Sequence, residues 1–297
     1  MPGAFLAHGL SISSFIPLPE LRTLDREADV VVKAGDLAFF SASESVDGCL
    51  HATPDEALFL WEGAGRFLIR GGNEVIVDPV GDADERVLRL YLLGPVLGLL
   101  LQQRGRLVLH GSAVATASGV AAFLGESGAG KSTIAAGLHR RGYPAVADDL
   151  VSIDPAHEPP AIDPGFPLLK LWPDAAAGLG YDPLVMPILR PDAEKRALEL
   201  HGDFPSAPLH PLRIYAITTG ETNAIEPLTP RDGMIELMRH SYIAPILERM
   251  GAAPANMMQC AGLAARVPVL RLHVHRSITA LPALLDLIEQ DLGDPPR

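Results

Sequence analysis

The sequence predicts a small β-rich domain followed by an α/β domain, and three observations lead to this fold class. Short β-rich runs separated by turn residues fill residues 1 to about 80. Residues 82–104 then carry apolar side chains at helical spacing. A strand, a glycine-rich loop, a helix and another strand follow in residues 120–149, an order typical of an α/β layer. We expect a β-rich domain over residues 1–81 and an α/β domain over 82–297.

The clearest element of the first domain is a hairpin. Its strands are expected over residues 66–70 and 74–78, joined by Gly71, Gly72 and Asn73. These residue types tolerate the positive φ values that tight turns need. Further strands are expected over residues 10–13, 30–33 and 57–61.

A linking helix is expected over residues 82–104. Asp82, Asp84 and Glu85 stand at its N-terminal end, where negative charge stabilises a helix dipole. Its most apolar stretch is interrupted by Gly94 and Pro95 and is shorter than the roughly 20 residues that cross a bilayer. We therefore predict a buried helix.

Composition restricts the partners. The chain has 297 residues, with 24 Lys and Arg against 36 Asp and Glu, for a net charge of -12. Nucleic acid and anionic membrane surfaces require a basic surface, so neither is expected as a partner. The N-terminus lacks a basic stretch followed by a long apolar run, which predicts a cytoplasmic protein. Cys49 and Cys260 show no metal-binding spacing and are expected to be reduced core thiols.

The α/β domain is expected to contain strands at 107–109, 120–124 and 145–147, with a helix over 131–141. Prolines crowd residues 155–211 and predict a wandering loop region that could cover a site, with regular structure only locally around residues 192–201. A strand over 212–219 and a helix over 231–250 should follow. The strand over 267–275 and the helix over 277–292 come last, the helix with an apolar stripe of Ile278, Leu281, Leu285, Ile288 and Leu292.

A phosphate-binding loop is the strongest motif. Residues 125–133 match G-x-x-x-x-G-K-[ST] between a predicted strand and a predicted helix, which is the context that this motif requires. Glycines let backbone N–H groups surround a phosphate, Lys131 would reach the β and γ phosphates, and Ser132 would bind Mg²⁺. The predicted nucleotide-binding residues are Gly125, Glu126, Ser127, Gly128, Ala129, Gly130, Lys131, Ser132 and Thr133.

Two adjacent carboxylates follow this helix. Asp148 and Asp149 should end a strand; if it runs parallel to the strand before the loop, both reach the phosphate edge. One could hold Mg²⁺ while the other accepts a hydroxyl proton. The alternative is a solvated turn. His110 is expected at the end of the preceding strand, either near the phosphates or in a structural role.

Three runs resemble the catalytic domain of bacterial HPr kinase/phosphorylase: L-H-G-S-A-V at 109–114, the loop at 125–133, and R-G-Y-P-A-V-A-D-D-L-V at 141–151. The resemblance implies a P-loop kinase that uses ATP and Mg²⁺ to phosphorylate a serine of a polypeptide. It also implies that Asp148 is the base, that Asp149 helps Ser132 bind the metal, and that His110 lies near the phosphates. Lys131 would stabilise the transferred group.

A second resemblance narrows the expected partner. The family's later E-x-R-G-x-G-I type motif is replaced by other residues at 163–172, so the resemblance does not by itself imply the phosphorylase reaction or HPr as the substrate. The N-terminal segment and the runs at 164–172 and 236–242 look like stand-alone homologues from ribosomal peptide biosynthesis. These include lasso peptide kinases, which phosphorylate a precursor's C-terminal serine. Lys170, Arg239 and His240 would bind nucleotide or an acidic peptide end, or be solvated charges. HPr kinases are hexamers, so a homo-oligomer is compatible with the resemblance.

The sequence thus predicts an ATP- and Mg²⁺-dependent serine kinase with a peptide or protein substrate, a precursor peptide being favoured. An HPr(Ser) kinase-type regulator, a small-molecule kinase and a non-catalytic ATP-sensing module are the alternatives. The Asp148-Asp149 pair favours a kinase over a sensor but does not separate peptide from metabolite acceptors.

Overall fold

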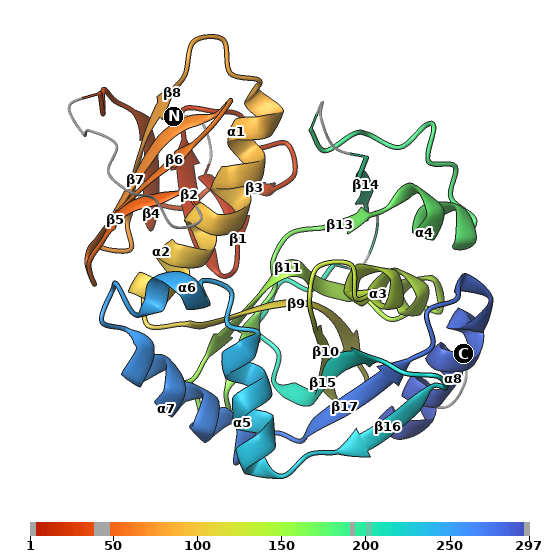
Figure 1. Cartoon of the computed structure of the whole chain (residues 1–297). Helices are drawn as coiled ribbons and strands as arrows, with labels where there is room; N and C mark the ends of the chain where they lie inside the picture. The colour runs from red at the N-terminus through yellow and green to blue at the C-terminus, as the bar shows by residue number, and fades with distance from the viewer. Residues whose placement is uncertain (1–3, 39–47, 191–193, 201, 203, 294–297) are drawn as a thin grey trace.

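The computed structural model describes residues 4–38, 48–190, 194–200, 202 and 204–293. Within these ranges the chain forms two large mixed sheets, a small two-stranded sheet and the helices that pack on them (Figure 1). The strands of the first sheet have the order β3-β1-β2-β4-β8-β7-β6-β5. Their bounds are β1 (Ala4–Ala7), β2 (Leu10–Ser14), β3 (Arg22–Leu24), β4 (Val30–Ala34), β5 (Cys49–Ala52), β6 (Glu56–Trp61), β7 (Gly65–Arg70) and β8 (Glu74–Pro79).

The expected hairpin is confirmed. β7 and β8 pair antiparallel, and Gly71 and Gly72 have φ values of 54° and 66° in the turn between them. The strands expected over residues 10–13, 30–33 and 57–61 are also present, as β2, β4 and β6. Local turn chemistry and alternation therefore predict this part of the chain well.

The linking helix is broken in its middle. It consists of α1 (Glu85–Tyr91), η1 (Leu92–Val96) and α2 (Leu97–Gln103). Gly94 has a non-helical φ of -107° and ψ of -108°, and Pro95 follows it. Proline has no N–H to donate to the preceding turn, which explains why the regular helix stops here.

A single apolar core joins the first sheet to the second part of the chain. Phe67 of the first sheet and Leu99 of the linking helix belong to the same buried cluster as Val108 and Leu150 of the second sheet. Figure 1 shows α1 and α2 lying against the first sheet. The domain boundary between residues 81 and 82 stays a prediction. The linking helix, which follows this boundary, packs against the first sheet, which precedes it.

The second sheet has the order β12-β11-β9-β10-β15-β17-β16. Its bounds are β9 (Leu107–Thr116), β10 (Gly119–Leu124), β11 (Ala145–Asp154), β12 (Ala161–Asp163), β15 (Pro211–Thr219), β16 (Ala224–Pro227) and β17 (Val269–Val274). β10, β15 and β17 are parallel, as an α/β layer predicts, but β9 lies antiparallel between β10 and β11. β10 and β11 therefore run in the same direction without being neighbours.

Two expected strand ends are wrong. Neither His110 nor the Asp148-Asp149 pair ends a strand, because β9 and β11 each continue for several residues beyond them. Buried apolar side chains on both sides of the polar residues, such as Val114 and Val151, explain the continuation. The register places Asp149 opposite Gly111, which also lies opposite Leu124, the last residue of β10. The carboxylates consequently lie level with the start of the phosphate loop.

The helix expected over 231–250 is also wrong, whereas the helix over 131–141 is confirmed as α3 (Lys131–Arg140). α5 (Pro230–Arg239) ends early, and α6 (Ala244–Leu247) and α7 (Ala253–Ala264) follow. The intervening residues pair with β9: His110 N donates to His240 O at 2.8 Å, and Tyr242 N donates to Val108 O at 2.9 Å. β10 stops opposite Gly111, so this segment occupies the edge of β9 that β10 leaves open.

The proline-rich region contains more regular structure than expected. It forms β13 (Leu168–Leu171), α4 (Pro173–Gly178) and β14 (Arg196–Glu199), and β13 pairs antiparallel with β14. β13 contacts β11 and brings Lys170 to the carboxylates.

The end of the described chain follows the predicted pattern with one exception. Leu270, Leu272 and Val274 of β17 are buried, as expected. η2 (Ile278–Ala280) and α8 (Leu281–Leu292) replace a single helix. The expected apolar stripe is buried at Leu281, Leu285, Ile288 and Leu292. Ile278, however, is 43% exposed, so its assignment to the core is wrong.

Cys49 and Cys260 are buried and free, as predicted for reduced core thiols. Across the described ranges, no helix is long and apolar enough to cross a membrane.

The shared core predicts that both sheets unfold together. Leu99 is fully buried in this core, so Leu99→Ala should lower the free energy of unfolding by about 2–5 kcal/mol. The chain has two tryptophans, Trp61 in β6 and Trp172 before α4. Trp172→Phe leaves Trp61 as the fluorescent reporter, and Trp61→Phe leaves Trp172. In urea unfolding, the two reporters should give the same midpoint, and Leu99→Ala should lower the free energy of unfolding by the same amount with either reporter.

A shift seen through Trp61 alone would contradict a shared core. Leu184→Ala is the matched control, because Leu184 is 88% exposed and its truncation should leave both midpoints unchanged.

Candidate functional site

The phosphate loop leaves helix α3 without a side-chain cap. Gly130 is the N-cap residue, with a φ of 99°, and no side chain accepts a hydrogen bond from the first turn. A Cβ placed on Gly128 or Gly130 would meet no atom within 4 Å, so these residues border open space. Uncapped N–H groups and the helix dipole attract anions. The local geometry therefore fits phosphate groups.

Lys131 lies folded against the loop. Its Nζ donates to Gly125 O at 2.8 Å and to Glu126 O at 3.0 Å, and the residue is buried. Burial lowers the pKa of Lys131, while the nearby Asp148 and Asp149 carboxylates oppose that effect. Both partners of Nζ are neutral carbonyls that a ligand with negative charge can replace.

Asp148 is buried beneath the loop and is the acceptor for three donors. Ser112 Oγ and Ser132 Oγ donate to its Oδ1 at 2.6 and 2.8 Å, and Lys170 N donates to its Oδ2 at 2.7 Å. The hydroxyl predicted to bind Mg²⁺ thus contacts Asp148, whereas the resemblance pairs Ser132 with Asp149 as metal ligands.

Asp149 has a backbone conformation that is uncommon for a residue other than glycine. Its φ is 72° in the middle of β11, and aspartate is among the residues that tolerate this region best. Consecutive side chains of a regular strand point to opposite faces. Here both carboxylates contact Lys170, which donates from Nζ to Asp149 Oδ2 at 2.8 Å. Such conformations concentrate at functional sites.

The Lys170 ammonium group stabilises the Asp149 carboxylate. Burial raises the pKa of Asp149, but the charge of Lys170 and its hydrogen bond outweigh burial and hold the pKa well below its usual range; the His110 ring adds to this effect only when it is protonated. The Asp149 carboxylate in turn raises the pKa of Lys170 against the opposing effect of burial. His110 Nδ1 lies 3.4 Å from Asp149 Oδ1.

His110 and Tyr242 complete the surroundings of Asp149. Burial and the charge of Lys131 lower the pKa of His110, so the ring is neutral near pH 7. Burial and the Asp149 carboxylate raise the pKa of Tyr242 well above its usual value. A Cβ on Gly94 would lie 3.4 Å from Tyr242 Oη and 3.9 Å from Asp149 Oδ2. The broken linking helix therefore passes close to Tyr242 and Asp149 at Gly94.

These residues surround a cavity of about 170 Å³, which we call the phosphate cavity. Gly125, Glu126 and Ala129 are absent from its lining. Trp172 and Lys195 form another wall, with Lys195 Nζ 5.4 Å from the Trp172 ring centre. The lining residues are His110, Ser127, Gly128, Gly130, Lys131, Ser132, Thr133, Asp148, Asp149, Lys170, Trp172, Asp174, Ala175 and Lys195.

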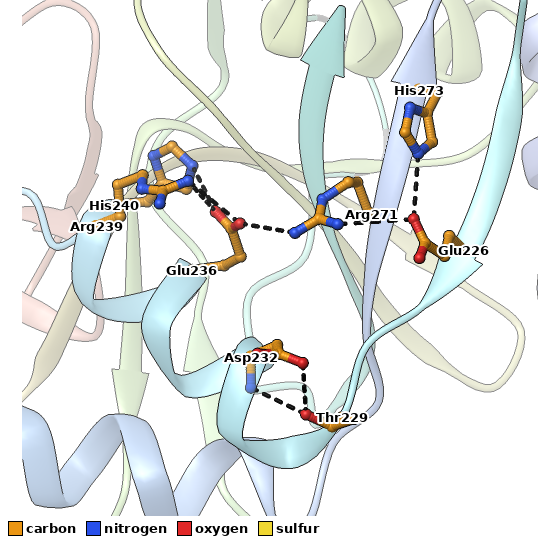
Figure 2. Close-up of polar contacts among 8 residues, drawn as sticks. All are labelled: Glu226, Thr229, Asp232, Glu236, Arg239, His240, Arg271 and His273. Carbon is orange, nitrogen blue, oxygen red and sulfur yellow. Dashed lines mark hydrogen bonds and ion pairs between the residues drawn. The ribbon is translucent and has the colours of Figure 1, made fainter. Parts of the chain in front are cut away.

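Arg239 and His240 lie in a separate polar cluster (Figure 2). Arg239 Nη1 contacts both oxygens of the buried Glu236, at 3.2 and 3.1 Å, and Arg271 Nη2 lies 3.2 Å from Glu236 Oε1. Burial lowers the pKa of the His240 ring, although the Glu236 carboxylate opposes that effect. Of the three cationic residues considered from sequence, Lys170 alone lines the phosphate cavity in the described structure.

Sequence reasoning missed Ser112, Trp172, Lys195 and Tyr242. Ser112, Trp172 and Tyr242 stand within the runs that carry the resemblances. Ser112 is two residues after His110 on the same strand. That spacing places both on one face and was a usable signal. Lys195 carried no signal, because it reaches the cavity through the long segment between α4 and β14.

The donor set fits Mg²⁺ bound together with phosphate. In the part of the chain that the structure describes, no group of three or more His, Cys, Asp or Glu residues could enclose a metal. Mg²⁺ usually takes one or two carboxylates and completes its shell with water and substrate phosphates. Asp148 with Ser132 supplies that kind of partial shell.

Comparison with known proteins gives little support beyond this geometry. No family model and no curated protein matches the sequence. Among solved structures, the HPr(Ser) kinase/phosphatase from Coxiella burnetii is similar at 13% identity and a TM-score of 0.32. The match covers 62% of this chain and 89% of that chain.

The lowered pKa of Asp149 predicts a pH-dependent contribution to stability. A carboxylate whose pKa is lower in the folded chain stabilises the fold above its unfolded pKa of about 4, and loses that effect as the pH falls. Asp149→Asn keeps a residue that tolerates positive φ and removes the charge. We expect a loss of about 1–3 kcal/mol at pH 7 and 5, and a smaller loss as the pH falls below the unfolded pKa of about 4.

Urea unfolding at pH 7, 5 and 3 measures this difference: the loss should be the same at pH 7 and 5, which both lie above the unfolded pKa, and smaller at pH 3. A loss at pH 3 as large as that at pH 7 would show that the ion pair is not its origin. Asp286→Asn is the control: its side chain is 70% exposed beside Arg141, and we expect less than about 1 kcal/mol at any pH.

Proposed function

We propose that this protein transfers the γ-phosphoryl group of MgATP to a serine hydroxyl of a peptide or protein. The observation that supports this most is the hydrogen bond from Ser132 to Asp148 beneath a phosphate loop, with Asp149 on the same cavity. A site that only hydrolyses a nucleotide requires Ser132 and Asp148 but no second carboxylate. The adjacent second carboxylate adds a group that can orient an acceptor hydroxyl.

The loop side would bind the nucleotide phosphates. The uncapped N-terminus of α3 and the backbone of residues 128–132 would hold them, and Lys131 would exchange Gly125 O and Glu126 O for phosphate oxygens. Ser132 and Asp148 would bind Mg²⁺, which would neutralise charge on the β and γ phosphates. Lys131 and the helix dipole would stabilise the charge that develops during transfer.

The Asp149 side would receive the acceptor. The serine oxygen would form a bond to the γ phosphorus while the bond from that phosphorus to the bridging oxygen breaks, releasing ADP. Asp149 would accept the serine proton, and Lys170 keeps it ionised beforehand. Its low basicity suits a loose transition state, in which the hydroxyl is positioned first and loses its proton late. This assignment exchanges the roles that the resemblance implies for Asp148 and Asp149.

The acceptor class is part of the proposal. The resemblance to kinases of ribosomal peptide biosynthesis favours a precursor peptide with a C-terminal serine, and a net charge of -12 suits a neutral or basic polypeptide. A cytoplasmic location and assembly into a homo-oligomer belong to the same proposal.

The acceptor test is intact-mass spectrometry after incubation with MgATP. A precursor peptide ending in serine should gain one phosphoryl mass, and the same peptide ending in alanine should not. A gain on HPr instead would favour an HPr(Ser) kinase-type regulator. No gain on either, with ATP bound, would favour a small-molecule kinase or an ATP sensor.

Three variants test the assigned roles. Lys131→Ala should lower kcat by at least about 10³-fold. Asp149→Asn should keep Mg²⁺-dependent ATP binding and lower the transfer rate by about 10²–10⁴-fold. Asp148→Asn should lose the dependence of ATP binding on Mg²⁺, because its carboxylate is placed on the metal side. Calorimetric titration of ATP with and without Mg²⁺, together with single-turnover transfer, separates these effects.

The opposite pattern, with Asp149 needed for Mg²⁺-dependent binding and Asp148 for transfer alone, would restore the roles implied by the resemblance. Asp286→Asn, which lies outside the phosphate cavity, should leave binding and transfer unchanged.

A further inference from the structure

A second cavity adjoins the phosphate loop. It has a volume of about 350 Å³, compared with about 170 Å³ for the phosphate cavity. Its walls come from the loop, the first turns of α3 and α4, and the segment that joins β17 to α8. The lining residues are Gly128, Ala129, Gly130, Thr133, Ile134, Asp174, Ala175, Val274, His275, Arg276, Ser277, Ile278, Leu281 and Leu284.

The two cavities divide the phosphate loop into a polar side and an apolar side. Lys131 and Ser132 line the phosphate cavity, Ile134 lines the second one, and Gly130 and Thr133 line both. In a phosphate loop, the lysine and the serine belong to the terminal phosphates and the metal. The remainder of a bound nucleotide must leave the loop on the side away from these two residues, which is the side of the second cavity.

Apolar side chains form the interior of the second cavity. Val274, Leu281 and Leu284 are buried, whereas Ile278 is 43% exposed although it belongs to the same apolar stripe. An exposed large aliphatic residue at the wall of a concave site is an available contact for a flat apolar ligand group. Gly178 of α4 packs directly against Ile278 and holds α4 to η2.

Charged side chains are confined to the rim, and the half-buried Thr133 and Ser277 add two hydroxyl groups to the walls. Asp174, His275 and Arg276 are exposed, and the interior offers no charged side chain to the edge of a base. Strong discrimination between bases requires buried polar groups that only one base satisfies. This cavity would therefore bind by contact area, with its rim near the ribose.

We infer that the second cavity binds the nucleoside of a purine nucleoside triphosphate through apolar contact, with Ile278 as its principal determinant and with similar affinity for ATP and GTP. This inference rests on the proposed function, because it places the nucleoside by the direction of the phosphates. Ligand binding measures it independently of phosphoryl transfer.

The experiment is calorimetric titration of the full chain with Mg²⁺ and either ATP, GTP or tripolyphosphate, which carries the phosphates without a nucleoside. Wild-type protein should bind ATP and GTP with dissociation constants within about fivefold, each at least about tenfold tighter than tripolyphosphate. Ile278→Asn should weaken ATP and GTP binding on the order of tenfold and leave tripolyphosphate binding unchanged.

Ile235→Asn is the matched control. Ile235 is 41% exposed on α5 and lines neither cavity, so its substitution should change none of the three affinities. Unchanged tripolyphosphate binding in Ile278→Asn also shows that the loop remains folded, and Ile278→Val should retain the wild-type affinities.

Three results would overturn the inference: equal ATP and tripolyphosphate affinities in the wild type, unchanged ATP binding in Ile278→Asn, or a preference between ATP and GTP of about 100-fold or more. Each leaves phosphate binding, and with it the proposed function, standing. Failure of the wild type to bind either ATP or tripolyphosphate would instead overturn the proposed function and this inference together.

Discussion

The contact of Lys170 with two neighbouring carboxylates is the interaction on which the site depends. Its backbone N–H donates to Asp148 and its ammonium group donates to Asp149, so one residue holds both acids. Adjacent carboxylates would otherwise repel each other in a partly buried position. The same contact attaches β13, and with it the proline-rich segment, to the middle of β11. Lys170 thus both holds one wall of the cavity in place and keeps Asp149 ionised.

The first sheet contributes to the site through the broken linking helix. The helix passes close to Tyr242 and Asp149 at Gly94, and both halves of the helix pack into the core that the two sheets share. A Cβ at this position would stand in van der Waals contact with the Tyr242 hydroxyl. The linking helix therefore packs on the first sheet and also lies near Asp149 of the phosphate cavity, although the phosphate loop itself follows a strand of the second sheet.

Local signals predicted the elements whose shape is decided locally. The hairpin around Gly71 and Gly72, the strand before the phosphate loop and the helix α3 follow from turn residues and periodicity over a few positions. The end of helix α5 at Arg239 could not be predicted from local signals, because the residues that follow it pair with the edge of β9 that is open where β10 ends. Lys170 could be noted but not assigned a partner, since the path of a proline-rich segment depends on distant packing. Ile278 fits the spacing of the apolar stripe of its helix, but its side chain lines the second cavity and is not part of the core.

The positive φ of Asp149 also constrains how this chain can change over evolutionary time. Most side chains are strained in that conformation, whereas glycine, asparagine and aspartate accept it. A lineage that lost the need for the carboxylate could drift to asparagine or glycine without disturbing the strand, and it would meet a barrier at β-branched residues. The identity of this one residue in related chains would record whether the chemistry was kept, while the backbone stayed as it is.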